Sequence, residues 1–233
     1  MEPLIQYAHT VGITLEDAHI KQFAILLKEL QKKNKEFNLT AITEEKDIIL
    51  KHFIDSLSLV PHIPKNTETL IDIGTGAGFP GLPIKIVRPE IKVTFLEATI
   101  KKISFIEHVL TTLSIKNCRT IHTRAEEAGQ DLRFREQFDI ATARAVAELN
   151  VLAEYTLPFL KVGGLFLAQK STGQEEIMQG DKAIKTLGGE IKNIVPINIE
   201  GLENRQLVII EKVAPTPEKY PRRPGQASKK PIQ

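Results

Sequence analysis

The feature that most constrains this chain is an apolar stretch that runs directly into a cluster of glycines. Residues 70–73 read Leu-Ile-Asp-Ile, and the glycines follow at Gly74, Gly76, Gly78 and Gly81. Because glycine has no side chain, such a cluster allows a sharp backbone turn and the close approach of a ligand. A helix that follows the turn begins with amide groups that have no partner inside the helix. We therefore predict a buried strand, a ligand-binding turn and a helix in this segment.

From residue 68 onward, short apolar runs alternate with segments of helical periodicity. The runs that predict strands are 69–73, 93–96, 119–122, 138–141 and 165–168. Strands that alternate with helices form a parallel sheet with helices on both faces. Two further runs, 190–199 and 206–211, are joined only by a short turn around Gly201 and predict an antiparallel hairpin. The sequence thus predicts an α/β fold with a Rossmann-like seven-stranded sheet, five parallel strands plus a terminal hairpin.

The two ends of the chain differ from this central part. Residues 1–65 have helical periodicity and are expected to form an N-terminal helical extension to a main domain at 66–212. The whole chain has a net charge of +2, whereas residues 212–233 hold six Lys or Arg residues against Glu218 alone. A basic, proline-rich tail at 213–233 is expected to be flexible and to suit a polyanionic partner, although a merely solubilising tail has the same composition.

Several classes of protein are excluded by what the sequence lacks. The single cysteine, Cys118, rules out an intramolecular disulfide, and the six histidines have no metal-ligand spacing. No apolar run approaches the ~18–20 residues that a membrane-spanning helix needs. The first residues do not resemble a secretory signal. We therefore expect a cytoplasmic protein with no metal centre and no membrane segment.

The glycine cluster fits two ligand-binding motifs. From Gly76 it reads G-x-G-x-x-G, the dinucleotide fingerprint, and Glu97 lies twenty-one residues further on. From Asp72 it reads D-x-G-x-G-x-G, the opening motif of class I S-adenosylmethionine enzymes. The predicted strand ends at residue 73, so Gly74 opens the turn and the register favours the second motif. Glu97 follows the next predicted strand, where it either accepts hydrogen bonds from two ribose hydroxyls or is a surface residue that caps the strand.

Other segments are narrower in their distribution than a generic glycine motif. They are residues 38–43, 51–57, 72–81 with its Phe-Pro-Gly ending, 88–89, 143–145, 220–225 and 229–231. Together these segments resemble the ribosomal small-subunit methyltransferase G family, also called glucose-inhibited division protein B. The resemblance covers nearly the whole chain.

The resemblance implies an enzyme that transfers the methyl group of S-adenosyl-L-methionine (SAM) to N7 of one guanine in 16S rRNA. It implies cofactor contacts at five positions of this sequence, namely Gly74, Phe79, Ala125, Glu126 and Arg144. The glycine motif and the general geometry of the fold add Gly76, Gly78 and Glu97. The substrate is then naked 16S rRNA or an assembled small ribosomal subunit.

Guanine N7 makes a specific chemical demand, because it is a free lone pair on the major-groove edge of the base. It attacks the methyl group in line and releases no proton, so we expect catalysis by positioning and no acid–base residue. Such positioning supplies roughly 7–11 kcal/mol of a barrier. The segment after the fourth predicted strand lacks both an Asn/Asp-Pro-Pro-aromatic motif for amine methylation and a cysteine nucleophile for carbon methylation, and Cys118 lies elsewhere.

Some side chains keep more than one interpretation. Arg144 follows a strand, where it holds a cofactor carboxylate or an RNA phosphate, or forms a salt bridge with Glu148 four residues on. His52 and Asp55 lie three residues apart on one helix face. They either cover the mouth of the site and help to place the base, or they form a local hydrogen bond, or His52 is a core histidine whose hydrogen bonds are satisfied. Phe79 is a candidate stacking surface for a base.

For RNA we predict contacts from the basic tail through Arg222, Arg223, Lys229 and Lys230. Deletion of residues 215–233 is then expected to weaken RNA binding without changing cofactor affinity. Two other functions are compatible with the sequence. A nicotinamide-dependent oxidoreductase fits the G-x-G-x-x-G match but lacks an obvious hydride-transfer motif. A non-catalytic RNA-binding module on a methyltransferase fold is the other.

Overall fold

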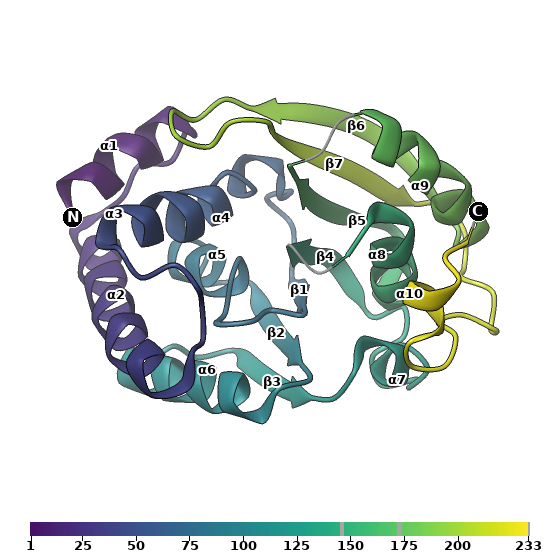
Figure 1. Cartoon of the computed structure of the whole chain (residues 1–233), viewed down its shortest axis with the longest axis horizontal. Helices are drawn as coiled ribbons and strands as arrows, with labels where there is room; N and C mark the ends of the chain where they lie inside the picture. The colour runs from purple at the N-terminus through teal and green to yellow at the C-terminus, as the bar shows by residue number, and fades with distance from the viewer. Residues whose placement is uncertain (145–146, 172–173, 233) are drawn as a thin grey trace.

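One mixed sheet runs through the computed structural model, which describes residues 1–144, 147–171 and 174–232 (Figure 1). Across these ranges the sheet has seven strands in the order β3-β2-β1-β4-β5-β7-β6. They are β1 (Thr69–Ile73), β2 (Lys92–Glu97), β3 (Cys118–His122), β4 (Phe138–Arg144), β5 (Leu160–Lys170), β6 (Gly189–Ile197) and β7 (Arg205–Lys212). The strands β1 to β5 pair in parallel, and β7 runs antiparallel to β5 and β6. The predicted architecture of five parallel strands and a terminal hairpin is confirmed.

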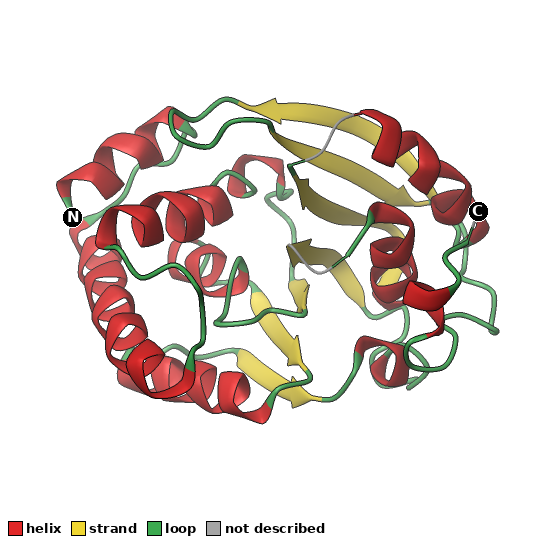
Figure 2. Cartoon of the chain, viewed as in Figure 1, coloured by secondary structure: helices red, strands yellow, loops and turns green. Residues whose placement is uncertain are grey.

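Helices cover both faces of this sheet (Figure 2). One face carries α1 (Glu2–Thr10), α2 (Asp17–Phe37), α3 (Glu45–Ile48), the π-helix Ile49–Ile54, α4 (Asp55–Leu57), a 3-10 turn (Val60–His62), α5 (Gly81–Val87) and α6 (Ile100–Thr112). The other face carries α7 (Ala125–Ala128), α8 (Leu149–Thr156), a 3-10 turn (Leu157–Phe159), α9 (Gln174–Thr186) and α10 (Gln226–Lys229). Among the helices of the described residues, none has both the length and the apolar character needed to cross a bilayer.

Each face of the sheet has its own hydrophobic core. In β1, Leu70 packs beneath the N-terminal helices and Ile71 packs into the opposite core, because successive side chains of a strand point to opposite faces. Phe23 and Phe53 are fully buried, with ring centres 5.1 Å apart. Residues of the predicted N-terminal extension therefore share a core with the sheet.

The C-terminal segment, residues 213–232, packs along the α8 side of the molecule (Figure 1), which corrects the expectation that it is flexible. Its Thr216, Tyr220 and Ala227 are buried. The carbonyl groups of Thr216 and Tyr220 each accept a hydrogen bond of 2.7 Å from the Arg135 guanidinium. Composition alone was misleading here, because the partners that order this segment belong to the body of the protein.

Candidate functional site

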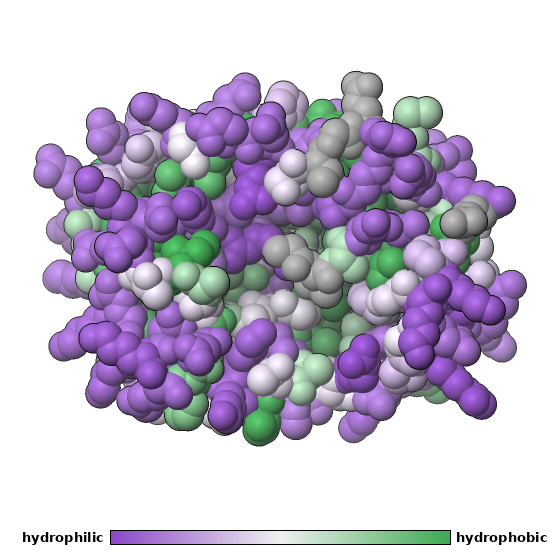
Figure 3. All heavy atoms as spheres, viewed as in Figure 1, coloured by the Kyte–Doolittle hydropathy of each residue, from purple (hydrophilic) through white to green (hydrophobic). Residues whose placement is uncertain are grey.

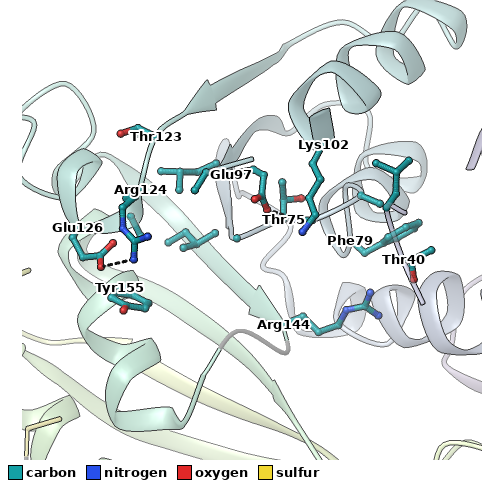
Figure 4. A pocket seen from close by; sticks show the side chains of 18 of the residues that line it. Thr40, Thr75, Phe79, Glu97, Lys102, Thr123, Arg124, Glu126, Arg144 and Tyr155 are labelled. Atoms are coloured by element: carbon teal, nitrogen blue, oxygen red, sulfur yellow. Dashed lines mark hydrogen bonds and ion pairs between the residues drawn. The ribbon is translucent and has the colours of Figure 1, made fainter. Parts of the chain in front are cut away.

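A cavity of about 430 Å³ lies at the carboxyl ends of β1, β2 and β4, the edge at which open α/β sheets bind ligands. Seven of the eight predicted cofactor residues line it, namely Gly74, Gly76, Phe79, Glu97, Ala125, Glu126 and Arg144. In Figure 4, Thr40, Phe79 and Arg144 lie on one side of the cavity, and Glu126 and Tyr155 lie on the other. The fold thus brings residues from distant parts of the chain to one place.

The glycine-rich turn between β1 and α5 adopts backbone conformations that other residues rarely reach. Gly74, Gly76 and Gly78 have φ angles of 62°, 61° and 90°. A Cβ atom on Gly76 would meet nothing within 4 Å, whereas one on Gly78 would lie 2.3 Å from Cδ1 of Leu82. Gly76 therefore leaves space for a ligand. Gly78 instead allows the turn to pack on α5, and it is the one predicted cofactor residue that does not line the cavity.

Asp72 is the buried support of this turn. Its Oδ2 accepts hydrogen bonds from the Thr75 hydroxyl at 2.5 Å and the Gly81 amide at 2.8 Å, and its Oδ1 accepts one from the Thr142 hydroxyl at 3.2 Å. Burial raises the pKa of the Asp72 carboxyl to about 6, although these hydrogen bonds act in the opposite direction. The shape of the turn therefore depends on a carboxyl group that does not itself line the cavity.

Glu97, at the end of β2, joins the glycine turn to the start of α6. Its Oε2 accepts a hydrogen bond from the Gly76 amide, and its Oε1 accepts one from the Thr99 amide, both at 3.0 Å. Each carboxylate oxygen accepts more than one hydrogen bond, so both oxygens keep capacity for a ligand hydroxyl. The side chain is buried and lines the cavity, which does not fit the alternative of a surface glutamate.

Arg144, the last residue of β4, contacts residues from the N-terminal part of the chain. Its Nη1 donates to the Lys51 carbonyl at 2.7 Å and to Oδ2 of Asp55 at 3.0 Å. Its Nη2 donates to Nδ1 of His52 at 2.8 Å. The ion-pair partner is therefore Asp55 and not Glu148, the partner that the sequence suggested as an alternative.

His52 lies in the π-helix and faces the cavity, with its ring stacked on Phe79 at a centre-to-centre distance of 4.5 Å. Its Nε2 is 2.9 Å from Oγ1 of Thr40. Burial, and then the charge of Arg144, lowers the pKa of His52 to about 3, so the imidazole is neutral near pH 7. Because an arginine only donates, Nδ1 is an acceptor and Nε2 carries the hydrogen.

Asp55 is fully buried and lies beside Arg144. Its Oδ1 lies 3.5 Å from Nε of Arg205 in β7, and its backbone carbonyl accepts a hydrogen bond of 2.5 Å from the Gln169 amide in β5. His52 and Asp55 thus bond to distant elements rather than locally, and of the two only His52 lines the cavity. One buried carboxylate, shared by two guanidinium groups, fixes the position of Arg144.

The opposite wall of the cavity is supported from behind by the C-terminal segment. Oε1 of Glu126 accepts hydrogen bonds from the Gly225 amide at 2.9 Å and from Nη2 of Arg124 at 3.2 Å. The hydroxyl groups of Tyr155 and Ser228 lie 3.0 Å apart. Two lining residues on this wall are therefore held by residues of the C-terminal segment.

Next to Tyr155, the buried Glu154 forms an ion pair with the half-buried Arg222 of the same segment. Arg222 donates to Glu154 from its amide at 2.8 Å, from Nε at 2.9 Å and from Nη2 at 2.6 Å. Arg222, a predicted RNA contact, is thus part of an internal pair. Arg223, Lys229 and Lys230 are exposed. The surface over the α10 region of Figure 1 is largely hydrophilic in Figure 3.

Sequence reasoning missed Thr40, Lys102, Arg124 and Tyr155 as lining residues. Of these, only Thr40 had a signal, since it lies in the 38–43 segment used for the family resemblance. Ala145, the last residue of the 143–145 motif, lies outside the described residues. Among the residues that are described, no group of three or more His, Cys, Asp or Glu side chains could hold a metal ion.

This sheet, its terminal hairpin and the glycine turn after β1 define a class I SAM-dependent methyltransferase fold. A precorrin-6y C5,15-methyltransferase from Geobacter metallireducens GS-15 superposes with a TM-score of 0.52 at 16% identity, over 74% of this chain and 90% of that chain. A ribosomal protein L11 methylase from Lactobacillus delbrueckii subsp. bulgaricus superposes with a TM-score of 0.55 at 14% identity, over 70% and 79%. Identities this low establish the fold alone.

Sequence comparison identifies the family. The family model for GidB, described as rRNA small subunit methyltransferase G, matches residues 19–208. The ribosomal RNA small subunit methyltransferase G of Leuconostoc citreum (strain KM20) is 46% identical over 236 residues, which cover 100% of this chain and 99% of that protein. This chain therefore belongs to the rRNA small subunit methyltransferase G family, as its motifs predicted. Family and fold confirm SAM as the cofactor.

Proposed function

We propose that this protein transfers a methyl group from SAM to N7 of one guanine in 16S rRNA, in the cytoplasm, by direct in-line attack and without a general base. Membership of a methyltransferase family leaves the oxidoreductase hypothesis without support. The atom that is methylated, and the way in which it reacts, are the parts that the proposal adds.

The state of His52 carries this proposal, because it is the only imidazole that lines the cavity among the described residues. Arg144 occupies one ring nitrogen and Thr40 the other, and the pKa of the ring is lowered to about 3. A general base needs a free lone pair and a pKa near the working pH, so His52 is a poor base. This environment favours a nucleophile that has no proton to lose, such as guanine N7.

When bound, SAM supplies an electrophilic methyl group on its sulfonium sulfur. In the proposed arrangement, Glu97 accepts hydrogen bonds from the ribose hydroxyls and Gly76 lets the cofactor approach the turn. Three of the five N–H donors of Arg144 are used by Lys51, Asp55 and His52, so two are available for the cofactor carboxylate. These contacts hold the methyl group in line with the attacking base, which is the source of the rate enhancement.

Contact with rRNA is assigned to the exposed cations of the C-terminal segment, Arg223, Lys229 and Lys230. Arg222 is assigned a structural role, because its guanidinium binds Glu154. The C-terminal segment therefore remains the proposed RNA-binding surface, with three contacts rather than four. Deletion of residues 215–233 should now weaken SAM binding as well as RNA binding, since it removes the partners of Glu126 and Tyr155.

The test is methyl transfer from labelled SAM to small subunits and to 16S rRNA that lack the modification, followed by nucleoside mass spectrometry. The expected product is 7-methylguanosine at a single position. Label in another nucleoside would overturn the N7 assignment. SAM binding without any transfer would favour the non-catalytic RNA-binding module instead.

A further inference from the structure

The hydroxyl group of Thr40 has both of its acceptor positions filled. It accepts a hydrogen bond from the Ile42 amide at 3.1 Å, and Nε2 of His52 donates to it at 2.9 Å. A hydroxyl has two lone pairs and one hydrogen. No hydrogen bond between described residues uses that hydrogen, and Thr40 lines the cavity. The cavity wall therefore presents a donor that lacks an acceptor within the described protein.

The donor character of Thr40 is fixed by its neighbours. Arg144 donates to Nδ1 of His52, so the hydrogen of the neutral ring is on Nε2 and points to Thr40. If the ring were in the other tautomer, Nε2 would accept the Thr40 hydrogen and this donor would be lost. Arg144 is itself held by Asp55 and by the Lys51 carbonyl. Arg144 thus donates both to Asp55 and to His52, and His52 in turn donates to Thr40.

The backbone of Thr40 is held equally firmly. Oδ1 of Asn34 accepts from the Thr40 amide at 2.8 Å, and Nδ2 of Asn34 donates to the Thr40 carbonyl at 2.9 Å. Asn34 belongs to α2 and is itself buried. A donor on a fixed backbone, bonded to a fixed ring, is suited to recognising one acceptor atom of a substrate.

We propose that the Thr40 hydroxyl donates a hydrogen bond to O6 of the target guanine and so selects guanine over adenine, an inference that rests on the proposed N7 reaction. O6 is adjacent to N7 on the major-groove edge of guanine, and adenine has an amino group at the same position. Thr40 has no lone pair left to accept from that amino group. Guanine therefore gains one hydrogen bond from Thr40. Adenine would instead place its amino group, a donor, against the Thr40 hydroxyl, which is also a donor.

The charge that develops on the base also favours a hydroxyl for this task. Methylation at N7 makes the guanine ring cationic, and a full positive charge bonded to O6 would oppose it. Thr40 is neutral, His52 is neutral near pH 7, and the Asp55 carboxylate, which also faces Arg205, offsets part of the charge of Arg144. The hydroxyl therefore reads the base without placing a cation against the product.

Two variants and two substrate analogues test the proposal. Thr40→Val removes the hydroxyl at nearly constant volume, and Thr40→Ser keeps it as the matched control. The analogues replace the guanine that the mass-spectrometry experiment identifies as the target. Of the two, 2-aminopurine lacks O6 and inosine keeps it, and both keep N7. Single-turnover rates are measured at saturating SAM on ligated rRNA in assembled subunits, and SAM affinity is measured by calorimetry.

We expect Thr40→Val to lower the rate on guanine by about three- to tenfold, the size of one net hydrogen bond, with SAM affinity unchanged. Thr40→Ser should stay within about twofold of the wild type. Wild-type protein should lose the same factor on 2-aminopurine and little on inosine. On 2-aminopurine the Thr40→Val variant should lose nothing more, because the two changes remove one and the same bond.

Equal wild-type rates on guanine and 2-aminopurine would overturn the proposal while leaving the N7 reaction intact. Fully additive losses from Thr40→Val and 2-aminopurine would do the same. A loss of SAM affinity at an unchanged saturated rate would assign the hydroxyl to the cofactor instead. Failure of the N7 reaction itself is seen separately, as wild-type protein that yields no 7-methylguanosine on natural rRNA.

Discussion

The two walls of the cavity come from opposite ends of the chain and are built in different ways. On one side, Thr40 and His52 of the N-terminal part line the cavity themselves. On the other side, the C-terminal segment stands behind the wall and holds Glu126 and Tyr155 through Gly225 and Ser228. Damage to the N-terminal wall should therefore change the rate of reaction, whereas damage to the C-terminal segment should change stability and cofactor affinity.

The largest expected effect is that of Arg144→Ala, which removes the residue that orders the N-terminal wall. The Asp55 carboxylate would keep Arg205 at 3.5 Å and a hydrogen bond of 3.3 Å from the Gln169 side chain, and His52 would lose the bond that fixes its tautomer. SAM affinity should fall, because two donors of Arg144 are assigned to the cofactor carboxylate. At saturating SAM we expect a rate loss of about 100-fold, as for a misplaced reacting group, and about 3 kcal/mol of lost stability. Single-turnover kinetics and denaturant unfolding measure the two.

Arg205→Ala is the matched control for this variant, because Arg205 also faces Asp55 but does not line the cavity. It should lower stability with a much smaller effect on rate. Equal rate losses in the two variants would show that Arg144 acts only as a partner for a buried carboxylate.

On the other side, Arg222→Ala leaves the buried carboxylate of Glu154 without its guanidinium partner. We expect about 2 kcal/mol of lost stability and a several-fold weaker SAM affinity, because Gly225 would be held less firmly against Glu126. The rate at saturating SAM should change little. Thermal unfolding measures the stability and calorimetry measures the SAM affinity. Arg223→Ala, at the exposed neighbouring residue, is the control and should change neither. A rate loss without an affinity loss would remove the distinction between the two walls.

A smaller effect is expected from the exposed cations of the same segment. The triple variant Arg223→Ala, Lys229→Ala, Lys230→Ala should weaken RNA binding about tenfold at moderate salt. It should also reduce the slope of log affinity against log salt by about 2, because three phosphate contacts no longer release counterions. SAM affinity should be unchanged. An unaltered salt slope would show that RNA binds to another surface of the protein.

The smallest expected effect is the loss of stability per pH unit that His52, in the N-terminal wall, causes. The pKa of His52 is about 3 in the folded protein and about 6.5 in an unfolded chain. Between these values only the unfolded state binds the proton, so stability falls as pH drops from 6.5 towards 3. The wild type should lose about 1 kcal/mol per pH unit more than His52→Gln in this window. Parallel stability–pH curves for the two proteins would contradict the buried neutral ring.

The parts of the molecule that sequence predicted are those whose causes are local. The strand at 69–73 and the turn after it follow from adjacent residues, and the register of the glycines with that strand separates the two ligand motifs. Glu97 was found because it follows the neighbouring strand. In each case the contacts join residues that are close in sequence or that lie on neighbouring strands of the sheet.

The parts that were missed depend on pairs far apart in the chain. Arg144 is ninety-two residues from His52, and nothing in either segment names the other as its partner. The C-terminal segment was expected to be flexible because its own composition is polar, yet Arg222 is ordered by a carboxylate sixty-eight residues away. The composition of a segment shows which groups it has for hydrogen bonds and ion pairs. Whether those groups find partners depends on the rest of the fold.

The support of Glu126 by Gly225 also sets an order of events in the making of this protein. Synthesis runs from the N-terminus. Residues 222–228 leave the ribosome after every residue that lines the cavity. A product released before residue 222 therefore contains every residue that lines the cavity, but it lacks the contacts that fix Glu126 and Tyr155.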